Sequence, residues 1–205
     1  MARPTTAERG REVRRKLLDV ACRLIAERGW TAVSTRMLAD RAGVTPGLVH
    51  YHFSSVQALL SEAATSAMRD YLDQAPGLFD QAESPSRGLE LLLGELDRHT
   101  GLDPQSLLFV EAYLAATRDD ALRGEISAVL AEFRSRLADW LGRCGVADPD
   151  ATAAVLAAAI DGVLMHRALS PGLRGSDIAP VLSRIFAPAA GERGQHETEG
   201  TGDPE

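Results

Sequence analysis

The sequence predicts an all-α protein, with a small N-terminal three-helix domain followed by a larger helical bundle, about nine helices in all. Alanine and leucine are abundant and aromatic residues make up only 5%, a composition that favours helix. Apolar residues recur at intervals of three and four, and glycine or proline punctuates these runs. With 205 residues, 45% of them hydrophobic, the chain is long enough for both parts.

The first helix is expected from about Glu8 to Arg28, after a disordered start over residues 1–7. Its apolar stripe consists of Val13, Leu17, Val20, Ala21, Leu24 and Ile25. Basic residues cluster at its beginning, namely Arg9, Arg11, Arg14, Arg15 and Lys16. This cluster is either a solvated helix face or, beside a DNA-binding motif, a set of phosphate contacts.

Residues 34–53 predict two short helices joined by a tight turn. Ser34 or Thr35 can cap the first helix and Thr45 the second, because a hydroxyl accepts a hydrogen bond from a first-turn amide. Gly43 falls where the chain must pass through a left-handed conformation. The residues expected to face inward are Leu38, Ala39, Ala42, Val49 and Phe53. This spacing is typical of a helix-turn-helix, although the pattern alone also fits an ordinary helix pair.

The outward face of the second of these helices carries no acidic residue and no lysine. Its members are Thr45, Gly47, His50, Tyr51 and His52. A solvated helix face usually carries charged residues, which are the types most often exposed in folded proteins. This face is therefore expected to lie against another molecule.

Residues of about 11–71 resemble the DNA-binding domain of the tetracycline-repressor (TetR) family of bacterial transcription regulators. The resemblance is carried by Thr35-Arg36, Leu38-Ala39, Ala42-Gly43-Val44, Gly47, Tyr51-His52-Phe53 and Leu59-Leu60. The chain departs from the family at Val49-His50, usually Leu-Tyr, and at Val56, usually a phosphate-binding lysine. The resemblance implies a transcriptional repressor that binds a pseudo-palindromic operator in double-stranded DNA.

The resemblance also implies how the motif meets DNA. Arg36 is expected to reach a guanine edge. The residues expected to face bases are Pro46, Gly47 and His50, and those expected to hold phosphates are Thr35, Thr45, Tyr51 and His52. In a two-fold symmetric dimer the two reading helices would lie about 34–36 Å apart, in successive major grooves.

The charge distribution supports DNA binding by one end of the chain. The net charge is −7, yet residues 1–60 hold ten Lys and Arg against five Asp and Glu. The remainder holds twelve Lys and Arg against twenty-four Asp and Glu. A basic end on an acidic body is expected when only that end meets phosphate, because the acidic part repels DNA and orients the approach.

The body is expected to contain six further helices. They are predicted over residues 54–74, 86–100, 104–118, 120–144, 149–169 and 176–187, with residues 188–205 disordered. We therefore divide the chain into a DNA-binding domain, 8–55, and a sensing and dimerisation domain, 56–187. The helix over 54–74 starts beside the motif and is expected to be the only element that links the two.

Four of the body helices carry most of its large aromatic side chains. The expected effector pocket comprises Met68, Tyr71, Phe109, Tyr113, Phe133 and Trp140, with His99 as a polar anchor. Apolar walls with a few polar groups are typical of ligand pockets, but also of a plain core. With the family resemblance, they favour a small, largely apolar effector that is not highly anionic. A constitutive DNA-binding or architectural protein without a ligand is the alternative, and it needs no cavity.

The helix over 149–169 is almost entirely small and apolar, which predicts that it is covered on all sides. With the last helix it is expected to form a four-helix seam across a symmetric homodimer. The expected interface residues are Ala154, Ala158, Asp161, Gly162, Met165, Val181 and Ile185. A monomeric core is the alternative.

Other chemistry finds little support in the sequence. His50 and His52 stand two apart on a helix and cannot share a metal, and no hydrolase or phosphate-loop motif is present. Asp161 is interpreted as a polar contact at a helix seam rather than a catalytic acid. Cys22 and Cys144 are expected to be buried thiols. We expect no cofactor, no metal and no membrane partner, and a cytoplasmic location.

Overall fold

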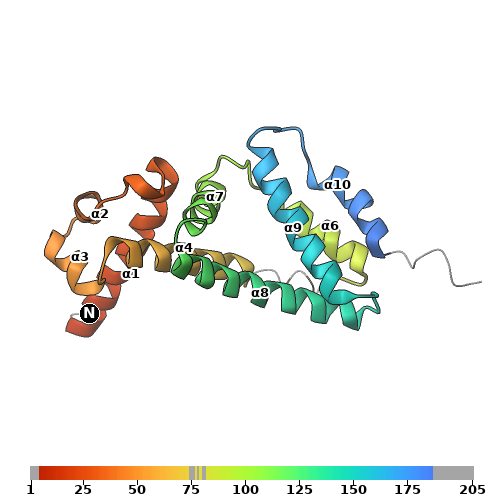
Figure 1. Ribbon diagram of the computed structural model, residues 1–205, viewed down its shortest axis with the longest axis horizontal. Coiled ribbons are helices and arrows are strands. Elements are labelled where there is room, and N and C mark those ends of the chain that lie inside the picture. Colours follow the sequence, from red (N-terminus) through yellow and green to blue (C-terminus); the bar gives the residue numbers. More distant parts are fainter. Residues whose placement is uncertain (1–4, 74–76, 78, 80–81, 187–205) are drawn as a thin grey trace, which may run out of the picture.

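The computed structural model describes residues 5–73, 77, 79 and 82–186. All regular structure within these residues is helical, and nine α-helices are traced in them, which confirms the predicted all-α class. The molecule is elongated, with α1, α2 and α3 at one end and α6, α9 and α10 at the other (Figure 1). The predicted disordered tail, 188–205, lies outside the described residues.

Helix α1, Thr6–Arg28, starts two residues earlier than the sequence predicted because of its cap. The hydroxyl of Thr5 accepts the amide of Glu8 at 3.2 Å, and the Glu8 carboxylate accepts the amide of Thr5 at 2.6 Å. This reciprocal pair satisfies two amides that have no partner inside the helix. The helix ends at Gly29, whose φ of 83° favours a residue without a side chain.

The helix-turn-helix is formed by α2, Thr35–Ala42, and α3, Pro46–His52. Ser34 caps α2 by accepting the amide of Met37, and Gly43 makes the turn with a φ of 65°. The predicted inward residues Leu38, Ala39, Ala42, Val49 and Phe53 are all buried. Thr45 precedes α3 as expected, but its side chain makes no capping hydrogen bond, which corrects the predicted cap.

Two helices of the body pack against α1. They are α4, Val56–Leu72, and α7, Pro104–Ala116. One continuous core joins α1 to both of them and to the first half of α8, Asp120–Arg143. The prediction that a single helix links head and body is therefore wrong, because the sequence stripe of α7 does not reveal that it crosses α1. We call α1–α3 the head and the remaining helices the body.

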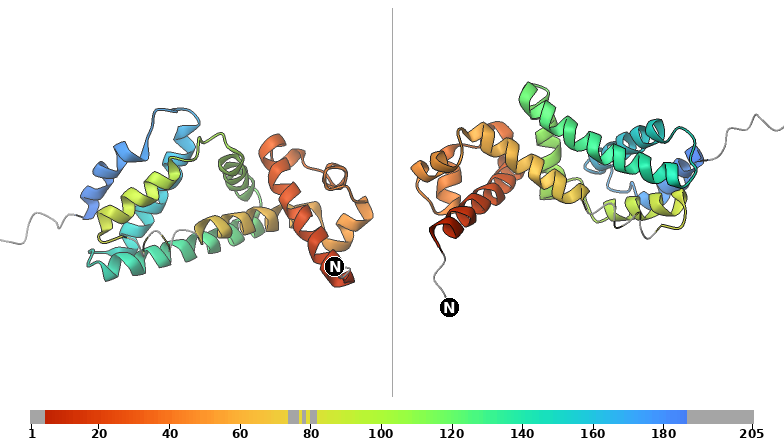
Figure 2. Two further views of the ribbon diagram at one scale, coloured as in Figure 1. Left: turned by 180° about the vertical axis from the view of Figure 1, so that it is seen from behind. Right: turned by 90° about the horizontal axis from the view of Figure 1, so that it is seen from below.

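The far end of the body has its own core. It joins α8 to α6, Pro85–Leu96, to α9, Pro149–Arg167, and to α10, Gly175–Leu182. The last predicted helix turns into a 3-10 helix at Ser183–Phe186. The two further views show the same separation of the chain into two ends, with α4 running from the first toward the second (Figure 2).

A buried arginine ties the far end together. Arg167 of α9 forms an ion pair with Asp97 at 2.9 Å and donates to the carbonyl oxygen of Leu96. Asp97 in turn accepts the amide of Gly175, the first residue of α10, at 2.7 Å. A buried charge is tolerated when it is paired and hydrogen-bonded in this way. This cluster fixes the end of α6 against α9 and α10.

The two cysteines differ in environment. Cys22 is partly buried, its thiol lies 3.5 Å from the Ala63 carbonyl oxygen, and burial raises its pKa to about 11. Cys144 is exposed, so the prediction that both thiols are buried is wrong for it. Its position explains the error, because it caps the C-terminal end of α8 where the helix surface meets solvent.

Candidate nucleic-acid interface and effector cavity

The residues expected to meet DNA come from the start of α2 and from α3, which lies at the end of the head remote from the body (Figure 1). We call the eight of them the DNA-reading surface. Its exposed members are Arg36, Thr45, Pro46, Gly47, His50 and Tyr51, and its half-buried members are Thr35 and His52. Their contact with DNA remains a prediction, and none of the eight is buried inside the head.

Internal packing does not explain the chemistry of this surface. Tyr51 is 82% exposed, and its ring meets only the edge of His52, with centroids 5.1 Å apart. A Cβ added at Gly47 would find no atom within 4 Å, so nothing inside the head requires a glycine there. The exposed side chain of Thr45, which makes no capping hydrogen bond, adds a hydroxyl that can donate or accept. These features fit a surface that another molecule approaches closely.

The basic residues of the head fall into two groups. Arg36 extends into solvent, with 89% of its side chain exposed and only Asp40 nearby at 3.9 Å. Arg14 instead pairs with both carboxylate oxygens of Glu62 and covers the ring of Phe53 at 4.7 Å. Arg14 therefore stabilises the joint between α1 and α4. The cluster members left exposed for a phosphate are Arg9, Arg11, Arg15 and Lys16.

A carboxylate on α7 holds the segment of the head that links α1 to α2. Glu111 accepts the backbone amide of Trp30 at 2.8 Å, directly after α1 ends. The indole N–H of Trp30 donates to Gln57 of α4 at 3.0 Å. A Cβ added at Gly29 would lie 3.4 Å from the Glu111 carboxylate, so the chain passes close to it. Sequence reasoning missed this junction, because no local pattern connects residue 111 with residue 30.

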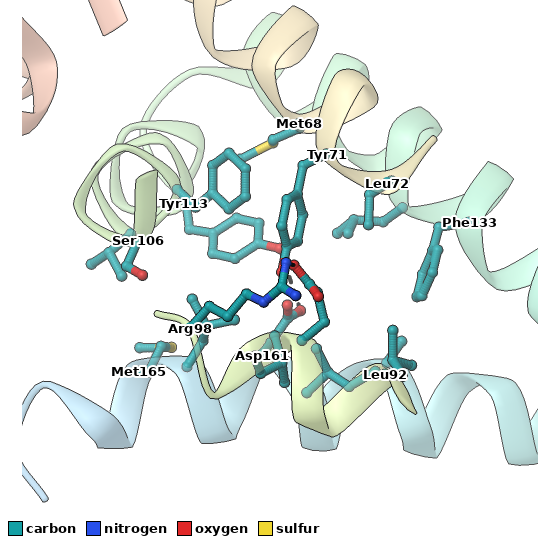
Figure 3. A pocket seen from close by; sticks show the side chains of 18 residues that line it. Met68, Tyr71, Leu72, Leu92, Arg98, Ser106, Tyr113, Phe133, Asp161 and Met165 are labelled. Atoms are coloured by element: carbon teal, nitrogen blue, oxygen red, sulfur yellow. Dashed lines mark hydrogen bonds and ion pairs between the residues drawn. The ribbon is translucent and has the colours of Figure 1, made fainter. Parts of the chain in front are cut away.

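The body contains a cavity of about 270 Å³ between α4, α6, α7, α8 and α9 (Figure 3). Five of the seven expected pocket residues line it, namely Met68, Tyr71, Phe109, Tyr113 and Phe133. Its volume lies just below the usual range for small-molecule sites, about 300–1,000 Å³. Tyr71 of α4 and Tyr113 of α7 are among the side chains that line it (Figure 3).

The other two expected pocket residues lie elsewhere. Trp140 belongs to the core at the far end, where it stacks on Phe79 at a centroid distance of 4.9 Å. A Cβ on Gly88 would lie 2.3 Å from its ring, so this glycine makes room for the indole. The helical stripe predicted that Trp140 is buried, but it does not specify on which side of the bundle.

His99 lies behind the cavity wall rather than in it. Its ring packs edge-on against Tyr71, with centroids 5.5 Å apart, and Nδ1 lies 3.2 Å from the Asp103 carboxylate. Asp103 caps α7 by accepting the Ser106 amide at 3.1 Å and the Thr100 amide at 2.9 Å. Burial raises the pKa of Asp103, but these hydrogen bonds outweigh it and lower the pKa to about 2. His99 thus supports Tyr71 from outside.

The polar residues of the cavity wall were not expected there. They are Glu95, Arg98, Ser106 and Asp161. Asp161 was expected at the dimer seam, and so was Met165, which also lines the cavity. Glu95 and Arg98 form an ion pair at 3.0 Å. The hydroxyl of Ser106 donates to Asp103 at 2.8 Å and is thereby occupied.

Asp161 is the exception among these polar groups. The Tyr113 hydroxyl donates to its Oδ2 atom at 3.3 Å, and burial raises the pKa of the carboxyl group. Burial, the Asp161 charge and this hydrogen bond all raise the pKa of Tyr113, so the phenol stays protonated and remains the donor. Burial also raises the pKa of Tyr71 to about 12. Asp161 was missed because its spacing on α9 fits either the seam or the cavity.

The other expected interface residues are apolar and lie on α9, at the end of α10 and in the 3-10 helix that follows it. Met165 is 50% exposed and Val181 56%, and Ala154, Ala158 and Ile185 are also exposed. A Cβ added at Gly162 would meet no atom within 4 Å. Val155 and Leu169 are exposed as well. The role of these residues in dimerisation stays a prediction.

Among the described residues, no three His, Cys, Asp or Glu side chains lie where they could hold a metal ion. None of the described helices is both long enough and apolar enough to cross a membrane.

Comparison with known proteins gives matches over both parts of the chain. Residues 17–63 match a family model described as bacterial regulatory proteins of the tetR family. Residues 83–188 match the model of the tetracyclin repressor-like C-terminal domain. The two models together cover most of the chain, including the helix-turn-helix and the cavity-lining residues from Leu92 onward.

Individual relatives agree with these matches. The chain is 30% identical to the HTH-type transcriptional regulator BetI of Rhizobium meliloti, over 77% of this chain and 79% of the relative. It is 30% identical to the HTH-type transcriptional repressor KstR2 of Mycolicibacterium smegmatis, over 58% and 55%. A crystal structure of a transcriptional regulator from Streptomyces coelicolor A3(2) superposes with a TM-score of 0.68 at 29% identity, covering 86% of this chain and 99% of that one.

Proposed function

The chain belongs to the TetR family of bacterial transcription regulators, and from that premise we propose that it is a homodimeric repressor released from its operator by a small molecule. The operator is a pseudo-palindromic double-stranded DNA, and each subunit reads one half-site with α3. The effector occupies the cavity of about 270 Å³ in the body. DNA binding follows from the family, whereas the effector response depends on the structure of the body.

One observation supports the effector response: the two helices α4 and α7 line the cavity and also pack against the head. Helices α4 and α7 line the cavity through Met68, Tyr71, Phe109 and Tyr113. The same two helices pack against α1 of the head. A ligand that separates α4 from α7 therefore acts on both supports of the DNA-reading surface. A constitutive DNA-binding protein requires neither the cavity nor these shared helices.

The junction at Trp30 supplies a route for this coupling. Glu111 of α7 holds the Trp30 amide, and Gln57 of α4 holds its indole nitrogen. Movement of either helix then shifts the link between α1 and α2 and changes the separation of the two heads. A ligand shifts this equilibrium only by its preference for the released state. A preference of about 100-fold corresponds to about 2.7 kcal/mol.

The dimer is supported by the exposed apolar residues of α9, of α10 and of the 3-10 helix that follows it. The small residues Ala154, Ala158 and Gly162 of α9 allow a second helix to approach closely. Exposed apolar side chains that gather in this way mark an interaction site. A two-fold axis through them would bring together four helices, α9 and α10 from each subunit.

Operator selection followed by release tests the proposal. The full-length protein is used to select duplexes from a randomised DNA pool, and binding of the selected operator is followed by fluorescence anisotropy. A panel of small molecules is then added to the preformed complex. We expect selection of an inverted repeat and release by at least one class of compound. A selected operator that no compound releases would support the constitutive alternative instead.

A further inference from the structure

The carboxylate of Asp161 faces the cavity without a cationic partner. Within the described residues the Tyr113 hydroxyl donates the carboxylate's only hydrogen bond, at 3.3 Å, and no Lys, Arg or His there forms an ion pair with it. An ionised carboxylate can accept about four hydrogen bonds. In Figure 3 the Asp161 side chain rises from α9 toward the aromatic residues of α4 and α7. A partly buried charge in this state lacks a counter-ion.

The other charges of the wall do not supply that counter-ion. Arg98 lines the cavity, but its side chain is 75% exposed and it pairs with Glu95 at 3.0 Å. This pair is neutral as a unit. The net charge of the lining is therefore negative, since Asp161 adds a second carboxylate to one guanidinium.

The apolar part of the wall is unusually aromatic for this chain. Four rings line the cavity, from Tyr71, Phe109, Tyr113 and Phe133, although aromatic residues make up only 5% of the sequence. Tyr71 and Phe109 lie edge to face, with centroids 5.8 Å apart. The face of an aromatic ring attracts a cation, and the attraction strengthens when the cation is desolvated. Rings and carboxylate together therefore favour the same sign of ligand.

From this arrangement we infer that the effector cavity binds an organic monocation, with the cationic group against Asp161 and the apolar part among the aromatic rings. The inference names the effector class of the proposed repressor, and its regulatory meaning rests on that proposal. A cationic effector is a more specific expectation than the largely apolar effector that the sequence suggested. A cavity of about 270 Å³ restricts the ligand to a small molecule, such as a quaternary ammonium compound carrying one ring.

Calorimetric titration with a charged and an uncharged isostere tests the inference without DNA. The probes are phenyltrimethylammonium and tert-butylbenzene, which differ in charge but hardly in shape. We expect the wild-type protein to bind the cation at least about tenfold more tightly. Equal affinity for the two probes, or tighter binding of the neutral one, would overturn the inference. So would the absence of binding by both phenyltrimethylammonium and a second, ring-free cation, tetraethylammonium.

The variant Asp161→Asn keeps the shape of the side chain and removes its charge. We expect it to lose the preference for the cation while it still binds the neutral isostere. Asp150→Asn is the matched control, because Asp150 lies exposed in the first turn of the same helix. A preference that survives Asp161→Asn, or one that Asp150→Asn removes equally, contradicts the assigned site. If Asp161→Asn fails to fold, the wild-type comparison of the two probes still decides.

The same compounds separate failure of the inference from failure of the proposed function. Cation binding that leaves operator affinity unchanged would keep the inference and count against release by this cavity. Release of the operator by neutral or anionic compounds alone would support the proposed repressor function but contradict the inference that its effector is a cation. Release by phenyltrimethylammonium, lost in Asp161→Asn, would support both.

Discussion

The DNA-reading surface draws its eight residues from two consecutive helices, whereas the effector cavity draws its lining from five helices spread over residues 68–165. The first is a local structure: Gly43 turns the chain, and Leu38, Ala39 and Val49 fix how the two helices cross. The second exists only when distant segments pack. Short-range pattern specifies the reading surface, while long-range packing specifies the cavity.

The two regions also differ in the sign of the charge that they present to an expected partner. The head exposes Arg36 and four further basic residues of α1, which suits phosphate. The body keeps a carboxylate, Asp161, in contact with its cavity. Each region thus presents a charge that its expected partner can neutralise. The junction at Trp30 joins the two regions, because Glu111 of the body holds the Trp30 amide of the head.

The largest effect is expected from breaking the dimer, which the head needs and the cavity does not. Ala158→Glu places a charge in the exposed apolar face of α9, and the mass in solution should fall from twice 21.9 kDa to 21.9 kDa. Operator affinity should drop by about 100-fold or more, because two linked half-sites act together. Sedimentation and anisotropy measure the two quantities.

Leu114→Glu is the control for this substitution, since Leu114 is 51% exposed on α7, outside the proposed interface. It should leave both mass and operator affinity unchanged. A dimer that persists in Ala158→Glu would place the interface elsewhere on the molecule.

A smaller effect is expected when one reading residue of the head is removed. Arg36→Ala should cost about 1–3 kcal/mol of discrimination between operator and random duplex, since a base contact is sequence-specific. Arg15→Ala should weaken both duplexes alike, as a phosphate contact does. Competition anisotropy with both DNAs gives the two affinities. Equal losses on both duplexes in Arg36→Ala would show that Arg36 does not read a base.

The junction should affect communication more than either binding event. Glu111→Ala removes the acceptor of the Trp30 amide, and it should weaken effector-induced release by roughly 1 kcal/mol, or about fivefold. Glu111→Gln keeps an acceptor oxygen and should retain most of the coupling. The measurement is operator affinity with and without effector. Undiminished release in Glu111→Ala would leave α4 as the sole route.

The smallest effect concerns the stability of the ligand-free body. Burial raises the pKa of Asp161 above its unfolded value, so its stabilising contribution exists at low pH and is lost as the pH rises through the folded pKa. Asp161→Asn does not titrate and should therefore have a higher Tm than wild type at pH 7. The difference should shrink as the pH falls toward 4. A wild type that is the more stable protein at pH 7 would contradict the burial argument.

Much of the fold was predictable because helix ends are encoded locally. Ser34, Gly43 and Gly29 mark boundaries that the structure places within one or two residues of the prediction. The sites were predictable only in part. Apolar periodicity showed that Trp140 is buried, but not that it faces Phe79 instead of the cavity. The spacing of Asp161 fits both the seam and the cavity, and the choice depends on how α9 rotates against α7 and α8.

The central claim is that the body cavity and the DNA-reading surface share one conformational equilibrium. Linkage requires that if an effector weakens operator binding, the operator weakens effector binding by the same factor. Calorimetric titration of phenyltrimethylammonium into the free protein and into the protein–operator complex compares the two affinities directly. We predict weaker binding to the complex, by the same factor as the cation lowers operator affinity. Equal affinity for both forms would contradict the claim.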